Sequence, residues 1–414
     1  MHIHNHTRQR IAVIGGGANG LIAALALKTQ LGEHVDVCVY ETLRKNSLEN
    51  QHRVVALAQT GLDFLKILNI WHSLEAHTQV IHRMCISDTA LEEPLRSILL
   101  TFTQPAALTE NDQKTIAAII PNARLNEEAR SKALAMGVVI LNHTVSDITQ
   151  DSAGGYVHMS DAKTNADMRY DLIVLADGSR STLRERLGFG WVEKQYTQTA
   201  LVGTLAHQHN HHGSAFQHFL PAGPFAILPL KPLADHPDGL PYRSSIVWSE
   251  RSEVARAMVS RPDVLEAIQL RAGSELGQIA LETPLQAFPL HCGLARSWVK
   301  NRVVLLGDSA HVFHPLAGQG LHLGLQDAQV LCECIKEAVA LGLSVSDVNA
   351  LQKYERIRRP AAVSMVLITD HINRLFSQKS LGLRLVRQLG MRLLEKLPAI
   401  KRSIMRIPQG QELR

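Results

Sequence analysis

The sequence has few of the features that mark membrane-spanning, disulfide-rich or nucleic-acid-binding proteins. None of its apolar runs approaches the 18 residues that a membrane-spanning helix needs. The five cysteines are an odd number without metal-ligand spacing, which predicts reduced, packed thiols. The formal net charge of +5 is too small to indicate nucleic acid as a partner. The sequence also contains no internal repeat and no low-complexity segment.

The first ten residues, MHIHNHTRQR, have no apolar segment like the middle of a secretory signal peptide. Together with the reduced thiols, this predicts a cytoplasmic protein. The alternating histidines are interpreted as a frayed leader, and no metal is expected. The length of 414 residues and an ordinary share of hydrophobic residues, 45%, favour a globular protein of two or three domains.

A strand, a glycine turn, a helix and a second strand follow at the N-terminal end. IAVI at 11–14 is a short apolar run, GGGANG follows at 15–20, and VDVCVYE at 35–41 is the second strand. The turn spells G-x-G-x-x-G inside a complete βαβ pattern, which makes this otherwise weak motif informative. The segment predicts a dinucleotide-binding Rossmann unit.

Each glycine of this turn has a different role in such a site. Gly15 allows the tight turn, Gly17 lets the backbone approach a pyrophosphate, and Gly20 permits close helix–strand packing. The helix that opens near Ala18 directs N–H groups and its positive dipole end at the phosphates. Glu41, at the end of the second strand, can accept hydrogen bonds from a ribose with a free 2′-OH, as in FAD or NAD.

The rest of the chain predicts more α/β structure around a β-rich insertion. The elements expected are helical periodicity over 53–71, a helix over about 122–136, strands at 137–142 and 171–178, short β-like runs between about 190 and 290, a core strand at 299–308, and helices from there to the end.

The stretch GDSAHVFHPLAGQGLHLGLQDA at 307–328 indicates FAD rather than NAD. Asp308 ends a strand and can accept hydrogen bonds from sugar hydroxyls, while Pro315 and the small residues let a flat ring lie against the main chain. The helix that opens near 320–323 presents N–H groups, which stabilise the negative charge of a reduced flavin. We therefore expect the glycines of this stretch to reflect close passage of the backbone over an isoalloxazine.

At this point the sequence resembles a known family. GGGANG, ADGSRSTLR at 176–184 and the 307–328 stretch look like the three fingerprints of single-component (class A) FAD-dependent aromatic monooxygenases. HPLAGQG, GPFAILPL at 223–230 and YERIRRP at 354–360 resemble, more narrowly, the ubiquinone-biosynthesis hydroxylases. The resemblance covers essentially the whole chain.

The resemblance implies a set of FAD contacts. Asp177 and Gly178, with Arg180 and Arg184, match a fingerprint associated with the FAD pyrophosphate and with transient NAD(P)H contact, and Asp308 matches a ribityl contact. The full expected cofactor-binding set is Gly15, Gly17, Ala18, Asn19, Gly20, Glu41, Arg53, Arg124, Asp177, Gly178, Asp308, Pro315, Gly318, Gln319, Gly320, Leu321 and His322.

The residues expected beside the reacting flavin are Pro315, His314 and His322. Pro315 matches the proline at the reacting face of the flavin. The family usually has asparagine where this chain has His322, and the histidine is interpreted as filling the same niche. The sequence offers no obvious general base; His314 is a candidate, whereas His311 is expected to support the loop.

The implied reaction is hydroxylation of a phenolic ring through a C4a-hydroperoxyflavin, with NADPH or NADH as transient co-substrate and O₂ as oxygen donor. The expected substrate is a polyprenylated phenol of ubiquinone biosynthesis. Two alternatives stay open: hydroxylation of a soluble aromatic compound, and a non-catalytic flavin-binding role in a multi-protein quinone-synthesis complex.

The expected fold is α/β: a glutathione-reductase-like FAD-binding Rossmann domain with an inserted, mainly antiparallel sheet domain and C-terminal helices. We assign 1–80, 106–186 and 291–345 to the FAD-binding domain, 81–105 and 187–290 to the substrate domain, and 346–414 to the helical region. The histidine-rich segment 207–218 is expected to be a solvated hairpin without metal.

The C-terminal region has nine Lys and Arg against one acid between Asn373 and Gln409. Apolar residues recur there at helical spacing: Leu383, Val386, Leu389, Leu393 and Leu397. A basic amphipathic helix predicts either peripheral contact with a membrane surface, here the inner face, or docking of a partner. The alternative is a solvated basic face with the leucines in the core.

Overall fold

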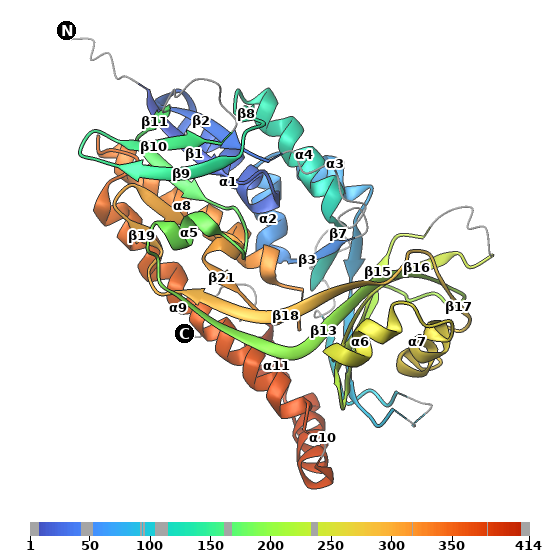
Figure 1. The fold of residues 1–414 in the computed structure, drawn as a ribbon. Helices are drawn as coiled ribbons and strands as arrows, with labels where there is room; N and C mark the ends of the chain where they lie inside the picture. The colour runs from blue at the N-terminus through green and yellow to red at the C-terminus, as the bar shows by residue number, and fades with distance from the viewer. Residues whose placement is uncertain are drawn as a thin grey trace.

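The computed structural model describes residues 8–42, 53–91, 93, 96–103, 115–160, 168–232, 239–316, 318–378 and 380–406 (Figure 1). Residues 1–7 of the expected leader and Ala317 of the HPLAGQG motif lie outside the described residues.

A six-stranded sheet, built from both ends of the chain, forms the centre of one half of the molecule. Five of its strands are parallel and β19 pairs antiparallel at one edge. In spatial order the strands are β19 (Val299–Lys300), β20 (Val303–Leu305), β12 (Leu172–Leu175), β1 (Gln9–Ile14), β2 (Val35–Tyr40) and β8 (Val139–Leu141). The strand β12 is buried along its whole length, as expected for a parallel strand covered on both faces.

Helices and a small sheet cover the two faces of this parallel sheet (Figure 1). One layer contains α1 (Ala18–Leu31), α4 (Asn122–Ala135) and α8 (Gly320–Ala340). The other is an antiparallel sheet of β9 (Val145–Gln150), β10 (Gly155–Met159) and β11 (Met168–Tyr170). The largest hydrophobic core lies between these layers.

A nine-stranded, mainly antiparallel sheet forms the second half (Figure 1). Its strands are β21 (His311–Val312), β18 (Gln286–Ala295), β13 (Trp191–His207), β16 (Tyr242–Arg251), β15 (Gly223–Leu230), β14 (Ser214–Leu220), β5 (Arg83–Asp88) and β6 (Leu100–Thr103), with β17 (Ile279–Leu281) paired to β13. Helices α6 (Ser252–Met258) and α7 (Val264–Ala272) share a hydrophobic core with one face of this sheet.

The opposite face of the large sheet contacts a third, three-stranded sheet of β3 (Val54–Ala58), β7 (Ala117–Pro121) and β4 (Gln79–Ile81). The short helices α2 (Gln59–Ile67) and α3 (Trp71–Glu75) follow β3, and α5 (Thr182–Arg186) follows β12. The parallel sheet with its helices, the antiparallel sheet and the C-terminal helices described below confirm the predicted fold class.

Two predicted segments of secondary structure are wrong. The segment 53–71, expected to be helical, begins with β3, because VVALA pairs residue by residue with β7 before the chain turns into α2. The single strand expected at 299–308 is divided at Asn301, whose φ of 52° turns the chain into the β19–β20 hairpin. The strand β18 also crosses residue 290, the expected end of the substrate domain, so the domain division stays a prediction.

The histidine-rich segment 207–218 is not a solvated hairpin. His207, His211 and His218 are buried, and each has a hydrogen-bond partner: Ser244 Oγ at 2.9 Å, the Leu230 carbonyl at 2.9 Å and Ser87 Oγ at 2.7 Å. Burial lowers the pKa of His207 to about 4 and that of His218 to about 3. These histidines are therefore neutral parts of the sheet domain.

The C-terminal helices are α9 (Val348–Phe376), α10 (Leu381–Glu395) and α11 (Pro398–Arg406). Most apolar residues of α10 point outward, with Leu385, Leu389 and Leu393 exposed by 66%, 70% and 59%, whereas Met391 and Leu394 pack in a hydrophobic cluster with β6. Arg387 of the same helix points inward and forms a buried ion pair with Asp88 of β5, with a distance of 2.9 Å. The interpretation that places the predicted apolar residues in the core is therefore wrong, because all five are exposed: Leu383, Val386, Leu389, Leu393 and Leu397.

All five cysteines are buried single thiols, as predicted. Within the described ranges, none of the helices combines the length and hydropathy needed to cross a membrane.

Candidate functional site

Four neighbouring parallel strands end at one edge of the central sheet, and most of the predicted cofactor residues follow them directly. The turn 15–20 follows β1, Glu41 follows β2, Asp177 follows β12, and Asp308 follows β20. The chain leaves β1 toward β2 on one side and returns as β12 on the other, so the strand order reverses here. Ligands of open α/β sheets bind in such a crevice.

In the glycine turn after β1, Gly15 and Gly20 are packed tightly against neighbouring backbone, whereas Gly17 lies in open space. A Cβ on Gly15 would lie 2.3 Å from the Ala176 carbonyl oxygen, and the φ of this residue is +120°. A Cβ on Gly20 would lie 1.9 Å from the Gly15 oxygen. Around Gly17, by contrast, there is open space in front of the α1 N-terminus. The turn therefore leaves room for an anionic group at the start of α1.

Glu41 has a partner that sequence reasoning missed. Both of its carboxylate oxygens accept hydrogen bonds from the Arg130 guanidinium of α4, one at 2.8 Å. This bidentate contact fixes the orientation of the carboxylate at the end of β2. Nothing in the spacing of residues 41 and 130 signals the pair, because α4 reaches β2 only through the tertiary fold.

The segment after β12 contains a buried carboxylate and a buried guanidinium. Asp177 accepts a 2.6 Å hydrogen bond from Ser181, its other oxygen has no partner among the described residues, and burial raises the pKa of its carboxyl. Arg184 stacks on Trp191 and donates to the Ser309 carbonyl at 3.0 Å. Arg184 thus ties two loops of the crevice together, while Arg180 is exposed.

Asp308 is exposed in the turn that follows β20. Protein nevertheless surrounds its carboxyl closely enough that burial raises the pKa of this group, against the opposing influence of His311 and Arg53. Arg53 is exposed just before β3 and lies 5.5 Å from the ring of Phe288 in β18. Arg53 thus lies close to both the Asp308 turn and the large sheet.

The glycines of the 307–328 stretch have two different explanations. Cβ atoms on Gly307 and Gly324 would lie 2.4 and 2.3 Å from side-chain atoms of Asn19 in α1. These two glycines therefore make room for Asn19, and the expectation that they reflect the flavin is wrong. Gly320 opens α8 with empty space around it, and Gly318 has a φ of +62°.

The three candidate histidines occupy different environments. His314 is buried beside Tyr196 at a ring distance of 5.1 Å, and neither of its nitrogens has a partner within the described residues. Burial lowers the pKa of His314 to about 4, so it is neutral near pH 7. His322 is fully buried and lies against Thr60 and Gly61 of α2. His311 is buried and bonded to Asp327 at 2.5 Å.

Asp327 of α8 is the centre of a buried network that sequence reasoning also missed. Besides His311, it accepts from Arg358 Nε of α9 at 2.7 Å and from the Gly307 amide at 3.3 Å. Burial opposes the charge, but His311 and Arg358 outweigh it and lower the pKa of the Asp327 carboxyl. The network joins α8, α9 and the turn that carries Asp308.

Other expected cofactor residues lie near the crevice with less distinct roles. Arg124 is exposed on the first turn of α4 and pairs with Glu127 at 2.9 Å. Pro315 and Leu321 are half-buried in the loop before α8 and in its first turn. Gln319 precedes α8, and its side-chain oxygen is buried without a partner in the described part of the chain.

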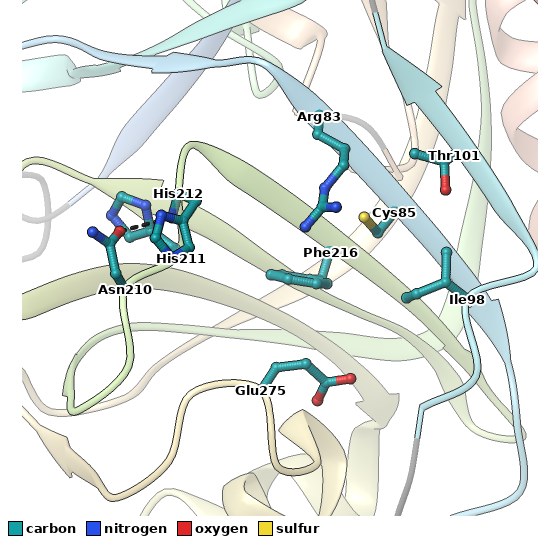
Figure 2. A pocket seen from close by; sticks show the side chains of 9 residues that line it. All are labelled: Arg83, Cys85, Ile98, Thr101, Asn210, His211, His212, Phe216 and Glu275. Carbon is teal, nitrogen blue, oxygen red and sulfur yellow. Dashed lines mark hydrogen bonds between the residues drawn. The ribbon is translucent and has the colours of Figure 1, made fainter.

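Two cavities of about 390 Å³ each lie away from this crevice. Figure 2 shows the first, with Arg83, Cys85, Phe216 and Glu275 around it. Phe216 belongs to the core shared with α6 and α7, so this cavity is on the far face of the large sheet. Neither cavity is lined by a residue of the predicted cofactor set.

The residues at the crevice fit FAD. Gly17, Gly178 and Gly320 leave open space where a Cβ would intrude on a ligand, and two of them stand at the starts of α1 and α8. Buried oxygens of Asn19, Asp177 and Gln319 lack partners among the described residues. An elongated molecule with phosphates, hydroxyls and a flat ring would use these groups.

Comparison with known proteins agrees with this geometry. A family model described as an FAD binding domain matches residues 8–369. Ubiquinone hydroxylase UbiL of Rhodospirillum rubrum is 34% identical over 406 residues, which cover 97% of this chain and 89% of the relative. The human mitochondrial ubiquinone biosynthesis monooxygenase COQ6 is 26% identical, covering 95% of this chain and 91% of its own length.

Solved structures show the same fold. The p-nitrophenol 4-monooxygenase PnpA of Pseudomonas putida has a TM-score of 0.78 at 19% identity, over 98% of this chain and 99% of its own. HpxO of Klebsiella pneumoniae, complexed with FAD and uric acid, has a TM-score of 0.72 at 18% identity and covers both chains completely. The family model and the UbiL match together show that this chain belongs to the ubiquinone-biosynthesis hydroxylases, a family of single-component, FAD-dependent aromatic monooxygenases.

Proposed function

We propose that this enzyme hydroxylates the aromatic ring of a polyprenylated phenol in ubiquinone biosynthesis. NAD(P)H is the electron donor, O₂ is the oxygen source, and oxygen transfer follows the flavin-borne route given above. The observation that carries the proposal is the 34% identity to a ubiquinone hydroxylase over 97% of the chain. The crevice described above supplies a place for the flavin on which this chemistry depends.

FAD, when bound, activates O₂. The protein's own residues bind and orient the FAD and shield it from water. We assign the pyrophosphate to the α1 N-terminus with Gly17 and Gly178, and the adenosine ribose to Glu41. Asp308 and Arg124 receive the ribityl chain. The first N–H groups of α8, at Gly320 and Leu321, would hold the flavin pyrimidine and stabilise the negative charge that this ring carries when reduced.

Pro315 and His314 are assigned to the reacting side of the flavin. His314 has two buried ring nitrogens without partners in the described chain, and its lowered pKa, about 4, keeps it neutral at physiological pH. A neutral imidazole can donate one hydrogen bond and accept another, so His314 is suited to orient a phenolic hydroxyl. We propose this positioning role instead of transfer of a proton as an imidazolium.

The test is turnover of purified protein loaded with FAD. We expect a polyprenylated phenol to stimulate NAD(P)H oxidation and to gain one oxygen atom, detected by mass spectrometry with ¹⁸O₂. Comparing NADH with NADPH identifies the donor. A coupled reaction with simple soluble phenols, and none with the lipid substrate, would favour the alternative of a soluble aromatic substrate.

Peripheral membrane contact belongs to the same proposal, because a polyprenylated phenol resides in the bilayer. We propose that the outward apolar side of α10 rests on the inner face of the cytoplasmic membrane, with the enzyme otherwise in the cytoplasm. The exposed Leu385, Leu389 and Leu393 support this assignment. The same surface would serve a multi-protein quinone-biosynthesis complex, which remains the alternative partner.

Removing the partner of Glu41 is expected to weaken cofactor binding. In Arg130→Ala the Glu41 carboxylate loses both hydrogen bonds that orient it. We expect the FAD dissociation constant to rise about tenfold, equivalent to ~1.4 kcal/mol. Titration of apoprotein with FAD, followed by flavin fluorescence, measures this. Lys132→Ala on the same helix is the control, and an unchanged affinity in Arg130→Ala would contradict the assignment of Glu41.

A further inference from the structure

Gly61 is the third residue of the short helix α2. Glycine in a helix is less favourable than alanine by about 1 kcal/mol, so its presence calls for a reason. A Cβ at residue 61 would lie 2.7 Å from Nδ1 and 3.1 Å from Cε1 of His322. These distances are shorter than ordinary van der Waals contact. The histidine ring therefore occupies the space that an alanine methyl would need.

His322 lies between α2 and α8. It is the third residue of α8 and fully buried. Its Nε2 is 3.4 Å from Thr60 Oγ1 of α2 and 3.2 Å from Gln326 Nε2, one turn further along α8. The ring thus fills the gap between the two helices and contacts both. Because the side chain of His322 is directed at α2, we assign it no catalytic role.

The unit formed by β3 and α2 borders the loop that precedes α8. Ala56 of β3 is the nearest neighbour of Gly318, at 3.5 Å from a Cβ built there, and Arg53 stands just before β3. The first N–H groups of α8 project from the end of this loop. A shift of α8 against α2 would therefore move these N–H groups relative to Arg53 and Asp308.

We propose that His322 and Gly61 form a matched pair that positions the first turn of α8 for the flavin. His322 is a positioning residue in this proposal, replacing the catalytic role considered from the sequence. The ring of His322 sets the spacing of α8 from α2, and the absence of a side chain at residue 61 makes room for it. The proposal rests on FAD occupying the crevice, but not on any particular substrate.

Four proteins test the pair: the unaltered chain, Gly61→Ala, His322→Ala and the double variant. In Gly61→Ala the new methyl displaces the ring, and we expect the FAD dissociation constant to rise about tenfold. If the reduced flavin loses ten times more affinity than the oxidised one, its midpoint potential falls by about 30 mV. His322→Ala alone should raise the dissociation constant about threefold.

The double variant decides the proposal. Alanine at residue 322 has no side-chain atom beyond Cβ, so the methyl at residue 61 can occupy the space left by Nδ1 and Cε1 of the histidine, and we expect FAD affinity and potential to return to within about threefold and ~10 mV of the unaltered protein. Effects of the two substitutions that simply add would overturn the proposal. So would a Gly61→Ala protein with unchanged affinity and potential.

A control variant and a fallback comparison keep the test decisive. Gly390→Ala in α10 is the control for adding a methyl inside a helix, because nothing lies within 4 Å of a Cβ there, and FAD affinity should not change. Should Gly61→Ala be insoluble, the double variant is compared with His322→Ala: similar FAD affinities support the pair, and a further tenfold loss in the double variant overturns it. Affinity and potential are measured without substrate, so failure of the pair is distinguishable from failure of the proposed hydroxylation.

Discussion

Replacing Asp327 with alanine is expected to lower the free energy of unfolding by about 3–5 kcal/mol. The carboxylate is fully buried and holds two groups that are themselves buried, His311 and the Arg358 guanidinium. Its removal leaves a buried guanidinium without its counter-charge, and the loss of a buried partner is more costly than the loss of an exposed one. Urea unfolding with saturating FAD, followed by circular dichroism and by flavin fluorescence, measures the change.

The loss of stability should be larger at the flavin site than elsewhere, because the Asp327 carboxylate also accepts a hydrogen bond from the Gly307 amide. That amide belongs to the turn that carries Asp308. We therefore expect the flavin signal of the variant to be lost at lower urea concentration than the helical signal. Coincident transitions in the variant would show that the network stabilises the fold without a separate effect on the cofactor loop.

Glu337→Ala on the same helix is the matched control. Glu337 pairs with Lys353 at 2.5 Å, but their side chains are 63% and 45% exposed. Exposed pairs contribute about 0–1 kcal/mol, so this variant should unfold almost as the unaltered protein does. If both substitutions have equally small effects, burial does not strengthen the Asp327 network as we infer.

The pH dependence of stability gives a second readout of the same network. The pKa of Asp327 is lower in the folded protein than its ordinary value, so its stabilising effect is present above that ordinary value. It is lost as the pH falls through the lowered pKa. The difference in unfolding free energy between the unaltered protein and Asp327→Asn should therefore shrink at acid pH.

Local patterns in the sequence predicted the residues that follow the parallel strands. The glycine turn at 15–20, Glu41, Asp177 and Asp308 could be placed because each directly follows a buried apolar run, and parallel strands end at one edge. The starts of α1 and α8 were predicted for the same reason.

Partners distant in sequence could not be predicted in this way. Arg130 and Glu41 are 89 residues apart, and Arg358 and Asp327 are 31 apart on different helices. No periodicity links such residues, because their contact depends on how α4 and α9 pack. The same holds for Asn19, whose side chain accounts for Gly307 and Gly324. A glycine-rich motif alone does not reveal whether a ligand or a neighbouring helix fills the space.

The orientation of α10 is a third feature that the sequence left open. Its apolar period predicts an amphipathic helix but not which face points inward. Contacts with Asp88 set the orientation of the helix. The Asp88 carboxylate forms a buried ion pair with Arg387, and the Asp88 carbonyl accepts a 2.7 Å hydrogen bond from Gln388. The helix is thus attached through these polar contacts and through Met391 and Leu394, which pack with Leu100 and Phe102 of β6, while Leu385, Leu389 and Leu393 are left exposed.

The largest effect on membrane binding is expected from Leu385→Ser/Leu389→Ser/Leu393→Ser. These leucines lie four residues apart and form one outward stripe on α10. Full burial of a leucine contributes about 1.5–3 kcal/mol, so half-burial of three in a bilayer surface contributes about 2.3–4.5 kcal/mol, or about 40-fold or more in partitioning. Sedimentation with vesicles of phosphatidylglycerol and phosphatidylcholine measures this.

Basic residues beside the stripe make the expected binding depend on lipid charge. Arg392 is exposed in the last turn of α10, and the exposed Lys396 follows at its C-terminal end. Each basic residue near an anionic surface contributes about 1 kcal/mol. We therefore expect weaker binding to pure phosphatidylcholine vesicles and at high salt. Truncation after residue 372 is a less specific test, because it also removes Phe376 and the Arg387–Asp88 pair.

Serine at Leu134, Leu341 and Leu343 provides the matched control, since these leucines are exposed at the ends of α4 and α8. The control should bind vesicles like the unaltered protein, and both triple variants should keep FAD and the same unfolding midpoint. If the stripe variant binds vesicles undiminished, α10 is not the membrane contact. If it loses vesicle binding yet hydroxylates a detergent-solubilised lipid phenol at full rate, α10 delivers the enzyme to its substrate without shaping the active site.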